Sequence, residues 1–483
     1  MLQSDSPTRT AATTRLAGEV AVAFLIGVAL TLIACRQGRQ LTFDGYFYVE
    51  FSKQFSSKWP DRFGNDWPFG WPIAGGLLAR LGVPAFWALV GLSALMLAGL
   101  LGSTAFFLRS QRYRLVLLIA VAAAPIIAPQ LSGCLTDLPF AATLVGLAAL
   151  LSLWPRRWAI WLAALTAILS LGLRYVGLIS VGLITINVLI NWRSLRNAGR
   201  LLEAIIAFAV ASAASGFLLA INVLRSGQAS GADRVVPEGL AAFPMELLNF
   251  GWSAPSALVA GGLRDRIGVA TSIGTAVGAL SFLIIVLLCA CSWFCPRSAH
   301  SRLLALVTLS YCTSMAILHC LGNFDALYGG RTFLPVLAPL VILFAERFSS
   351  NNALQYCFGS ALIVSGLVAS QRGISREISG DVRPAVAAIR ERISPTGRIG
   401  INDDAMSISA FFEQPTDRIW PRYMHGDSLY EFIVVAGRPT ARAGDSAPIG
   451  GEWTRLMDRL TSTGHYRYLI RDSRLMVIER VSP

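Results

Sequence analysis

Long apolar segments follow one another along most of the chain and are the dominant pattern in this sequence. A helical segment of about 20 apolar residues crosses the ~30 Å hydrocarbon core of a bilayer. The pattern therefore predicts an α-helical polytopic membrane protein of about eleven spanning helices. We place them at 16–35, 84–108, 113–131, 134–153, 157–173, 175–191, 202–224, 269–295, 303–321, 331–346 and 353–370.

The short loops between these segments alternate in charge, and this alternation predicts the orientation of the chain. Basic residues of short loops stay on the cytoplasmic side of a membrane. We therefore expect a cytoplasmic N-terminus and an extracytoplasmic C-terminus. The first apolar run is expected to be a span rather than a cleaved signal peptide, because no clear small-x-small site follows it. The arginines that share the predicted cytoplasmic side are Arg9, Arg15, Arg109, Arg112, Arg114, Arg156, Arg157, Arg193, Arg196, Arg200, Arg297, Arg302 and Arg347.

The first outer loop, roughly residues 36–82, is rich in aromatic residues. Apolar and aromatic residues at positions 43, 47, 48, 51 and 55 recur near helical spacing. This spacing predicts a short amphipathic helix in the membrane interface. A second apolar segment, Trp71 to Leu81, is too short to span and is also expected to lie flat.

The composition changes near residue 371. Residues 371–483 contain 16 basic and 14 acidic side chains, a balance typical of a soluble fold. We expect a transmembrane domain at 1–370 and a small extracytoplasmic α/β domain at 371–483. In the second domain, the patterns predict helices at 382–393 and 453–461, and strands at 398–402, 431–436, 468–472 and 475–480.

Composition excludes a soluble enzyme and argues against a nucleic-acid-binding protein. Hydrophobic residues make up 54% of the 483 residues, and charged residues only 14%, against about a quarter in soluble domains. The net charge of +13 lies largely in the short loops that set orientation. Most of the eight cysteines lie in or beside apolar segments, which favours packing thiols over a metal site.

Two carboxylates near the predicted outer ends of spans are candidates for chemistry. Asp44 begins the amphipathic segment of the first outer loop, where the alternative interpretation is a helix N-cap. Asp137 follows the turn Ser132-Gly133-Cys134-Leu135-Thr136. Thr136 or Asp137 is also suited to cap the next helix, with Pro139 in its first turn.

Two arginines lie at the same predicted face. Arg174, followed by Tyr175, stands between two spans with almost no loop, so its charge must reach the interface or meet an anion. Arg331 stands at the start of a late span, and a guanidinium binds phosphate with two parallel hydrogen bonds. The alternative for each is simple anchoring among lipid headgroups.

The order of these features resembles the GT-C superfamily of integral membrane glycosyltransferases, which includes protein mannosyltransferases and aminoarabinose transferases. The resemblance covers essentially the whole chain, although each motif is short. It rests on Asp44 with Tyr48 four residues later, on Thr136-Asp137-Leu138-Pro139, on Arg174-Tyr175, on Gly-Gln-Ala-Ser-Gly-x-x-Arg at 227–234, on Arg331-x-Phe-Leu-Pro, and on the small C-terminal domain.

The resemblance implies an inverting glycosyltransferase of the bacterial inner membrane. The donor would be a sugar on a polyprenyl phosphate, and the acceptor a cell-envelope glycan, lipid or protein. Asp44 would act as the catalytic base or its close partner, with Asp137 as a second catalytic candidate. Candidates for binding substrate or phosphate are Tyr48, Arg174, Tyr175, Arg234 and Arg331.

One position departs from the family pattern. Many members follow the first-loop aspartate with a second acid, whereas this chain has Gly45 there. The departure argues against a paired-acid metal site, so no obligatory metal is expected, and the use of a divalent ion stays open. Two other classes also remain open: a transporter or flippase of lipid-linked glycans, and a non-catalytic assembly protein. One pattern argues against a transporter: the two halves of the chain contain no corresponding apolar segments that glycine or proline interrupts.

Overall fold

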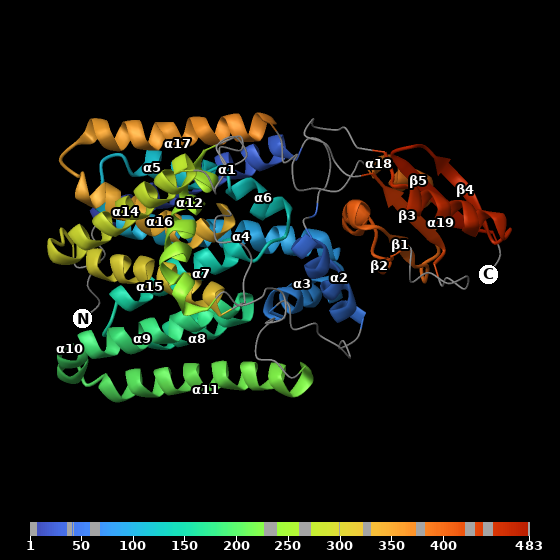
Figure 1. The fold of residues 1–483 in the computed structure, drawn as a ribbon. Helices are drawn as coiled ribbons and strands as arrows, with labels where there is room; N and C mark the ends of the chain where they lie inside the picture. Colours follow the sequence, from blue (N-terminus) through green and yellow to red (C-terminus); the bar gives the residue numbers. More distant parts are fainter. Residues whose placement is uncertain are drawn as a thin grey trace.

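The computed structural model describes residues 7–35, 41, 43–57, 68–226, 239–259, 272–298, 300–321, 330–372, 382–420, 430–437 and 448–481. These residues form a helical body and a small α/β C-terminal domain. Two helices of the first predicted outer loop, α2 and α3, lie between the body and that domain (Figure 1).

Helices cover the predicted spans. The segment 113–131 differs, because it is divided into α5 and α6 at Ala124-Pro125, where a proline disfavours helical backbone in the preceding residue. The helices of the body are α1 (Pro7–Ala34), α4 (Ala85–Phe107), α5 (Arg114–Ala123), α6 (Ile127–Ser132), α7 (Asp137–Ser152), α8 (Arg157–Leu173), α9 (Ile179–Ile190), α10 (Trp192–Asn197), α11 (Leu201–Ser226), α12 (Phe243–Leu258), α14 (Ser272–Phe294), α15 (Ser301–Cys320), α16 (Gly330–Arg347) and α17 (Asn352–Arg372), with the 3-10 turns η1 (Leu108–Ser110), η2 (Tyr175–Leu178) and η4 (Leu240–Ala242).

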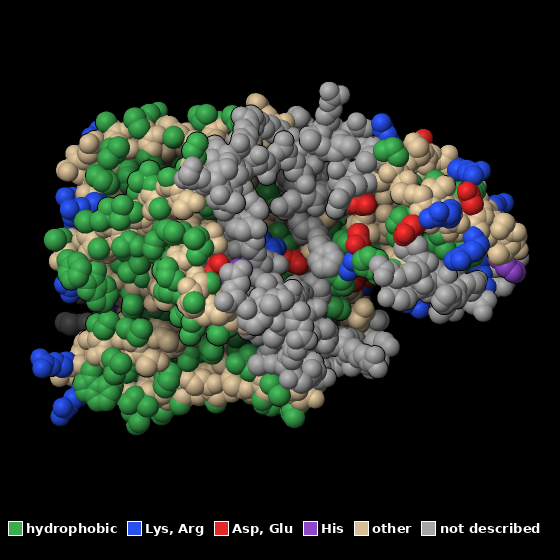
Figure 2. All heavy atoms as spheres, viewed as in Figure 1, with side chains coloured by type: hydrophobic (Ala, Val, Ile, Leu, Met, Phe, Trp, Pro, Cys, Tyr) green, Lys and Arg blue, Asp and Glu red, His purple; other side chains and the backbone are tan. Residues whose placement is uncertain are grey.

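Length and hydropathy make this chain a multi-pass membrane protein. Within the described ranges, six helices are long and apolar enough to cross a bilayer, and four shorter apolar helices accompany them. Exposed apolar side chains cover the visible face of the body, and arginines gather at the end away from the C-terminal domain (Figure 2). The number of eleven spans and the orientation of the chain remain predictions.

Helix α12 lies between the predicted spans at 202–224 and 269–295, where the hydropathy pattern predicts no helix. Phe250, Gly251 and Trp252 are buried where α12 packs against α14, α15 and α16. The crossing with α14 is close: a Cβ atom on Gly251 would lie 2.1 Å from the carbonyl oxygen of Gly278. This contact uses the glycine at position 251 because any side chain there would displace α14.

Helix α16 lies inside the body and brings Arg331 to one of its ends. Almost every residue from Thr332 to Ala345 is buried, including Pro335 and Pro339. The helix tolerates two internal prolines because its neighbours α7, α12, α14 and α15 surround it.

Helices α2 (Phe43–Ser57) and α3 (Gly70–Arg80) confirm the two short helices expected in the first outer loop. They approach each other closely, because Gly75 and Gly76 leave room for Ser52 and Phe55. A Cβ atom on Gly76 would lie 2.4 Å from the Cβ atom of Phe55. Helix α3 also packs on α4 and α8, so this helical pair is attached to the body.

The C-terminal domain contains a five-stranded sheet in the order β2-β1-β3-β5-β4. Strand β1 is parallel to β2 and β3, and β5 is antiparallel to β3 and β4. Both predicted helices and all four predicted strands are present, whereas β2 and η5 were not predicted. The elements are α18 (Arg383–Arg390), β1 (Ile399–Ile401), η5 (Asp403–Ala410), β2 (Thr416–Arg418), β3 (Phe432–Ala436), α19 (Gly451–Ser462), β4 (Tyr466–Arg471) and β5 (Leu475–Arg480). The domain boundary at 370/371 remains a prediction.

The α12–α14 crossing yields a test of the fold. Gly251→Ala should destabilise the protein by about 1–3 kcal/mol, the usual cost of overpacking a close contact. The matched control is Gly91→Ala on α4, where an added Cβ atom meets no neighbour within 4 Å. Thermal unfolding in detergent should show a lower midpoint for the first variant only. Equal midpoints for the two variants would contradict the close crossing.

Candidate functional site

Asp44 and Arg331, separated by 287 positions in the chain, form an ion pair at the end of the body that faces the C-terminal domain. Asp44 lies in the first turn of α2, and Arg331 in the first turn of α16. The Arg331 Nη1 atom donates to Asp44 Oδ2 over 2.7 Å. The Asp44 side chain is 19% exposed and that of Arg331 28%. A small polar group can therefore reach this pair from outside.

Asp137 and Arg174 form a second ion pair, deeper than the first. Asp137 lies in the first turn of α7, and Arg174 has extended backbone directly after α8. The Asp137 side chain is only 2% exposed. Its Oδ2 atom is buried without a hydrogen-bond partner among the described residues, so this carboxylate retains an acceptor for a donor group.

Tyr48 connects helix α2 to the start of α7. It follows Asp44 by one helical turn, so both side chains lie on one face of α2. The Tyr48 hydroxyl lies 3.3 Å from the Oγ1 atom of Thr136, which directly precedes Asp137. Thr136 occupies the N-cap position of α7, yet its side chain makes no capping bond. The expected capping role of Thr136 or Asp137 is therefore wrong, because their side chains contact Tyr48 and Arg174 instead.

The two ion pairs act as one charge cluster. Arg174 interacts electrostatically with Asp137 and Asp44, and Arg331 with both acids as well. Two carboxylates and two guanidinium groups leave the cluster formally neutral. An incoming anion can therefore bind the arginines only by competing with the carboxylates.

Tyr311 also belongs to this neighbourhood, although the sequence did not indicate it. It is buried on α15 and interacts electrostatically with Arg174, Asp137 and Arg331. Its ring packs against Phe140 and lies 6.1 Å from the ring of Phe250. An aromatic residue in an apolar segment resembles ordinary core, so the sequence carried no signal for it.

Two predicted binding residues lie apart from the cluster or beyond the described residues. The Tyr175 hydroxyl accepts a hydrogen bond from Asn222 Nδ2 of α11 over 3.2 Å. Tyr175 is therefore directed toward α11 while its neighbour Arg174 reaches Asp137. Arg234 lies outside the described residues. The predicted functional role of each remains a prediction.

Glu246 of α12 and His319 of α15 form another buried pair that the sequence did not indicate. Glu246 Oε2 lies 2.9 Å from His319 Nδ1, and the two side chains are 2% and 12% exposed. Glu246 also accepts a hydrogen bond from Asn249 of its own helix. Within the described ranges, no group of three or more His, Cys, Asp or Glu side chains is placed to hold a metal ion.

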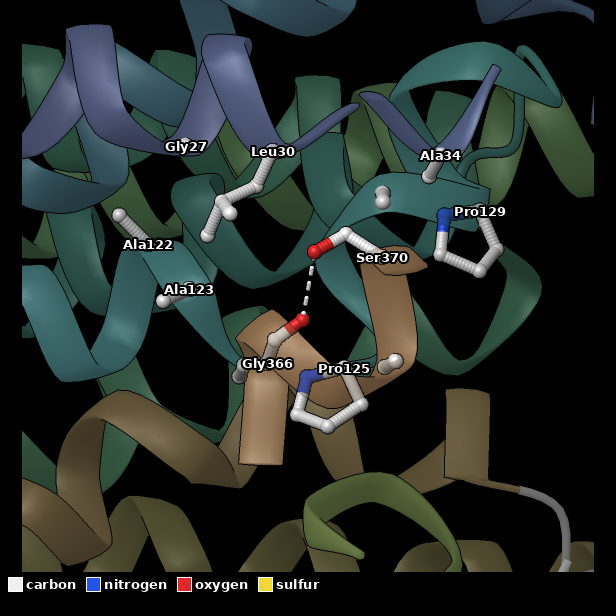
Figure 3. Close-up of a pocket in the computed structure, with 12 residues that line it drawn as sticks. Gly27, Leu30, Ala34, Ala122, Ala123, Pro125, Pro129, Gly366 and Ser370 are labelled. Atoms are coloured by element: carbon white, nitrogen blue, oxygen red, sulfur yellow. Dashed lines mark hydrogen bonds between the residues drawn. The ribbon is translucent and has the colours of Figure 1, made fainter. Parts of the chain in front are cut away.

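A small cavity of about 80 Å³ lies among α1, α5, α6 and α17, away from these charges (Figure 3). Small and apolar residues such as Gly27, Ala123 and Pro129 line it. Its one hydroxyl-bearing residue, Ser370, donates to the Gly366 carbonyl of the same helix. The cavity therefore offers no acid, base or cation, and none of the predicted site residues lines it.

The buried Asp137–Arg174 pair yields a test of the cluster. Arg174→Ala should destabilise the protein by about 3–5 kcal/mol, because it leaves a buried carboxylate without its counter-ion. The double variant Asp137→Ala/Arg174→Ala should recover much of that loss. Thermal unfolding in detergent measures both, and a double variant as unstable as the sum of its single variants would contradict the pairing.

No protein-family model and no curated protein sequence matches this chain. Solved structures do match it. ArnT from Cupriavidus metallidurans bound to undecaprenyl phosphate is 13% identical over 96% of this chain and 98% of its own, with a TM-score of 0.56. The oligosaccharyltransferase of Archaeoglobus fulgidus is 12% identical over 85% and 68%, with a TM-score of 0.46. The mycobacterial arabinofuranosyltransferase AftD is 14% identical over 96% and 41%, with a TM-score of 0.44. The resemblance expected from the sequence is thus confirmed at the level of the fold: the chain has the fold of the GT-C glycosyltransferases.

Proposed function

We propose that this protein is an inverting membrane glycosyltransferase that transfers a sugar from a polyprenyl-phosphate donor to a cell-envelope glycan, lipid or protein. The observation that carries the proposal is the accessible Asp44–Arg331 pair beside the buried Asp137–Arg174 pair. Together they bring a candidate base and two phosphate-binding cations to one end of a GT-C fold.

In this proposal Arg331 and Arg174 bind the phosphate of the donor. A guanidinium matches phosphate geometry, and its charge stabilises the negative charge that grows on the leaving phosphate. ArnT, the solved structure with a TM-score of 0.56, was determined with undecaprenyl phosphate. Two guanidinium groups contact the phosphate in this proposal, so it includes no obligatory metal ion. Tyr175 and Arg234 remain candidates for binding other parts of the substrates.

Asp44 acts as the general base. In the structure Arg331 donates to Asp44 Oδ2, so this oxygen is engaged by the guanidinium. The donor phosphate competes for Arg331 and so releases an oxygen of Asp44. That oxygen takes the proton of the acceptor hydroxyl, and the hydroxyl oxygen bonds to the anomeric carbon. The bond from that carbon to the phosphate oxygen breaks, and the polyprenyl phosphate leaves with the electron pair.

A single displacement of this kind inverts the anomeric centre, because the acceptor attacks the face opposite the leaving phosphate. Only one carboxylate of the cluster needs to accept a proton. Asp137 holds Arg174 in place and offers its free Oδ2 atom to a substrate hydroxyl.

We further propose that the protein lies in the bacterial inner membrane with the C-terminal domain extracytoplasmic. The positive-inside rule supports this orientation, because basic side chains gather at the end of the body away from that domain (Figure 2). The acceptor would then reach Asp44 from the side of the cell envelope.

Asp44→Asn should abolish transfer while leaving expression and membrane insertion intact. The loss of a general base lowers turnover by about 10²–10⁴-fold. The measurement is sugar transfer in proteoliposomes supplied with a panel of radiolabelled undecaprenyl-phosphate sugars. Asp472→Asn, a change in an exposed turn of the C-terminal domain, is the matched control. Turnover at the wild-type rate by Asp44→Asn would remove Asp44 from the mechanism.

Arg331→Ala should weaken the binding of undecaprenyl phosphate by roughly tenfold or more, since a charge-assisted hydrogen bond contributes about 1.5–3 kcal/mol. Arg331→Lys keeps the charge but lacks the planar pair of N–H donors. Its affinity for undecaprenyl phosphate should therefore lie between that of the wild type and that of Arg331→Ala. Quenching of intrinsic tryptophan fluorescence by undecaprenyl phosphate measures the affinity. An affinity of Arg331→Ala equal to that of the wild type would contradict the phosphate role.

A further inference from the structure

Helix α2 has two opposite functional faces. At 100° per residue, Asp44 and Tyr48 share the face that contacts the helical body. Tyr46, Glu50 and Lys53 lie on the opposite face, and all three contact the C-terminal domain. The candidate base and the contacts with that domain are therefore carried by one rigid element.

Glu50 is buried and accepts hydrogen bonds mainly from the C-terminal domain. The backbone N–H and the hydroxyl of Thr416 donate to its two oxygens over 3.1 and 2.7 Å. The hydroxyl of Ser409 also donates to it. Lys53 completes the set with an ion pair of 2.8 Å. The side chains of Glu50 and Lys53 are only 7% and 5% exposed. A buried carboxylate with this many donors is satisfied in only one arrangement of helix α2 and the C-terminal domain.

Lys53 is unusual in this chain, which has 39 arginines and only two lysines. Its ammonium donates to three acceptors in different parts of the fold: Glu50 Oε1 at 2.8 Å, Ser409 Oγ at 3.1 Å and the Gln414 carbonyl at 3.3 Å. A tetrahedral ammonium can direct its three donors this way, whereas the donors of arginine lie in one plane. The geometry thus explains a lysine at this position.

Further bonds extend the contact along the same face. The Tyr46 hydroxyl donates to the Thr416 carbonyl over 2.7 Å, and the Leu41 backbone N–H donates to Ser407 Oγ over 3.1 Å. Burial and the nearby Glu50 carboxylate raise the pKa of Tyr46 well above its ordinary value, so this phenol keeps its proton. The seam between α2 and the segments η5 and β2 is therefore polar, buried and satisfied.

We propose that Glu50 and Lys53 are positioning residues that make the C-terminal domain part of the catalytic apparatus, because they fix helix α2 from the side opposite Asp44. The role of Asp44 in this statement rests on the proposed function. Helix α3 supports a third side of α2 through Ser52, which donates to the Pro72 carbonyl over 3.1 Å. Loss of the Glu50–Lys53 contacts releases one of these supports. A displacement of the base by about 1 Å is sufficient to lower a rate about 10²-fold.

The test uses the full-length protein in proteoliposomes with three changes: Lys53→Met, Lys53→Arg and Glu50→Gln/Lys53→Met. Lys53→Met leaves Glu50 buried without its cation, and Lys53→Arg keeps the charge with the wrong geometry. The double variant removes both charges. Arg467→Gln is the matched control, since it removes the cation of a 2.9 Å pair with Glu479 elsewhere in the C-terminal domain, where Arg467 is 59% exposed.

Two measurements decide the outcome. Hydrogen–deuterium exchange of the α2 amides should accelerate at least tenfold in Lys53→Met and in Lys53→Arg. Turnover with the undecaprenyl-phosphate sugar that the wild type uses should fall at least tenfold, with the donor KM within threefold of the wild type. The double variant should show both effects as well, because it lacks the same contacts of Lys53 with Ser409 and Gln414, and Arg467→Gln should match the wild type.

Unchanged exchange of α2 would overturn the proposal. So would full turnover despite faster exchange, because the contact would then join two domains without positioning the base. If the wild type transfers no sugar, the proposed function fails. The contribution of Glu50 and Lys53 to the position of α2 is then decided by exchange alone, with acceleration in support and wild-type exchange against.

Discussion

The rest of the site depends on the ion pair between Asp44 and Arg331, because it joins helix α2 to helix α16 of the body. Neither charge can stay unpaired cheaply at the border of an apolar bundle. Pairing brings the start of α2 to the start of α16 and leaves both side chains partly accessible. The same constraint pairs Asp137 with Arg174 at a deeper level. The cluster of two carboxylates and two guanidinium groups is therefore formally neutral.

Helix α2 connects this cluster to the C-terminal domain. One face carries Asp44 and Tyr48, and the other carries Glu50 and Lys53 in a buried polar seam. A polar seam of this kind fixes the position of helix α2 relative to the C-terminal domain, since any shift between them would leave buried charges without partners. In our proposal the C-terminal domain thus contributes to the position of the candidate base, and none of its described residues forms an ion pair with the cluster. Helix α2, which carries the candidate base, is therefore contacted from two sides.

Much of the architecture was predictable from local pattern, and the exceptions have physical causes. Hydropathy located the helices of the body because apolar runs of spanning length have few alternatives to helix. It missed α12, whose glycine, proline and polar residues interrupt the run although its centre is buried. The alternation in the C-terminal domain located β3 and β5, but not β2, a three-residue edge strand with mostly polar side chains. Tyr311 was hidden because a buried aromatic in an apolar helix resembles core.

The sequence by itself determined the membrane class, the two short helices of the first predicted outer loop and the α/β character of the C-terminal domain, because composition and periodicity are local properties. Only the tertiary structure decided which charges are partners. Arg331 meets Asp44 across 287 positions, and Thr416 meets Glu50 across 366, distances at which no periodicity carries information. In the sequence, Glu50 and Lys53 are two opposite charges only three positions apart. Their role emerged only when folding buried both against the C-terminal domain, since burial turns a solvated pair into a specific contact.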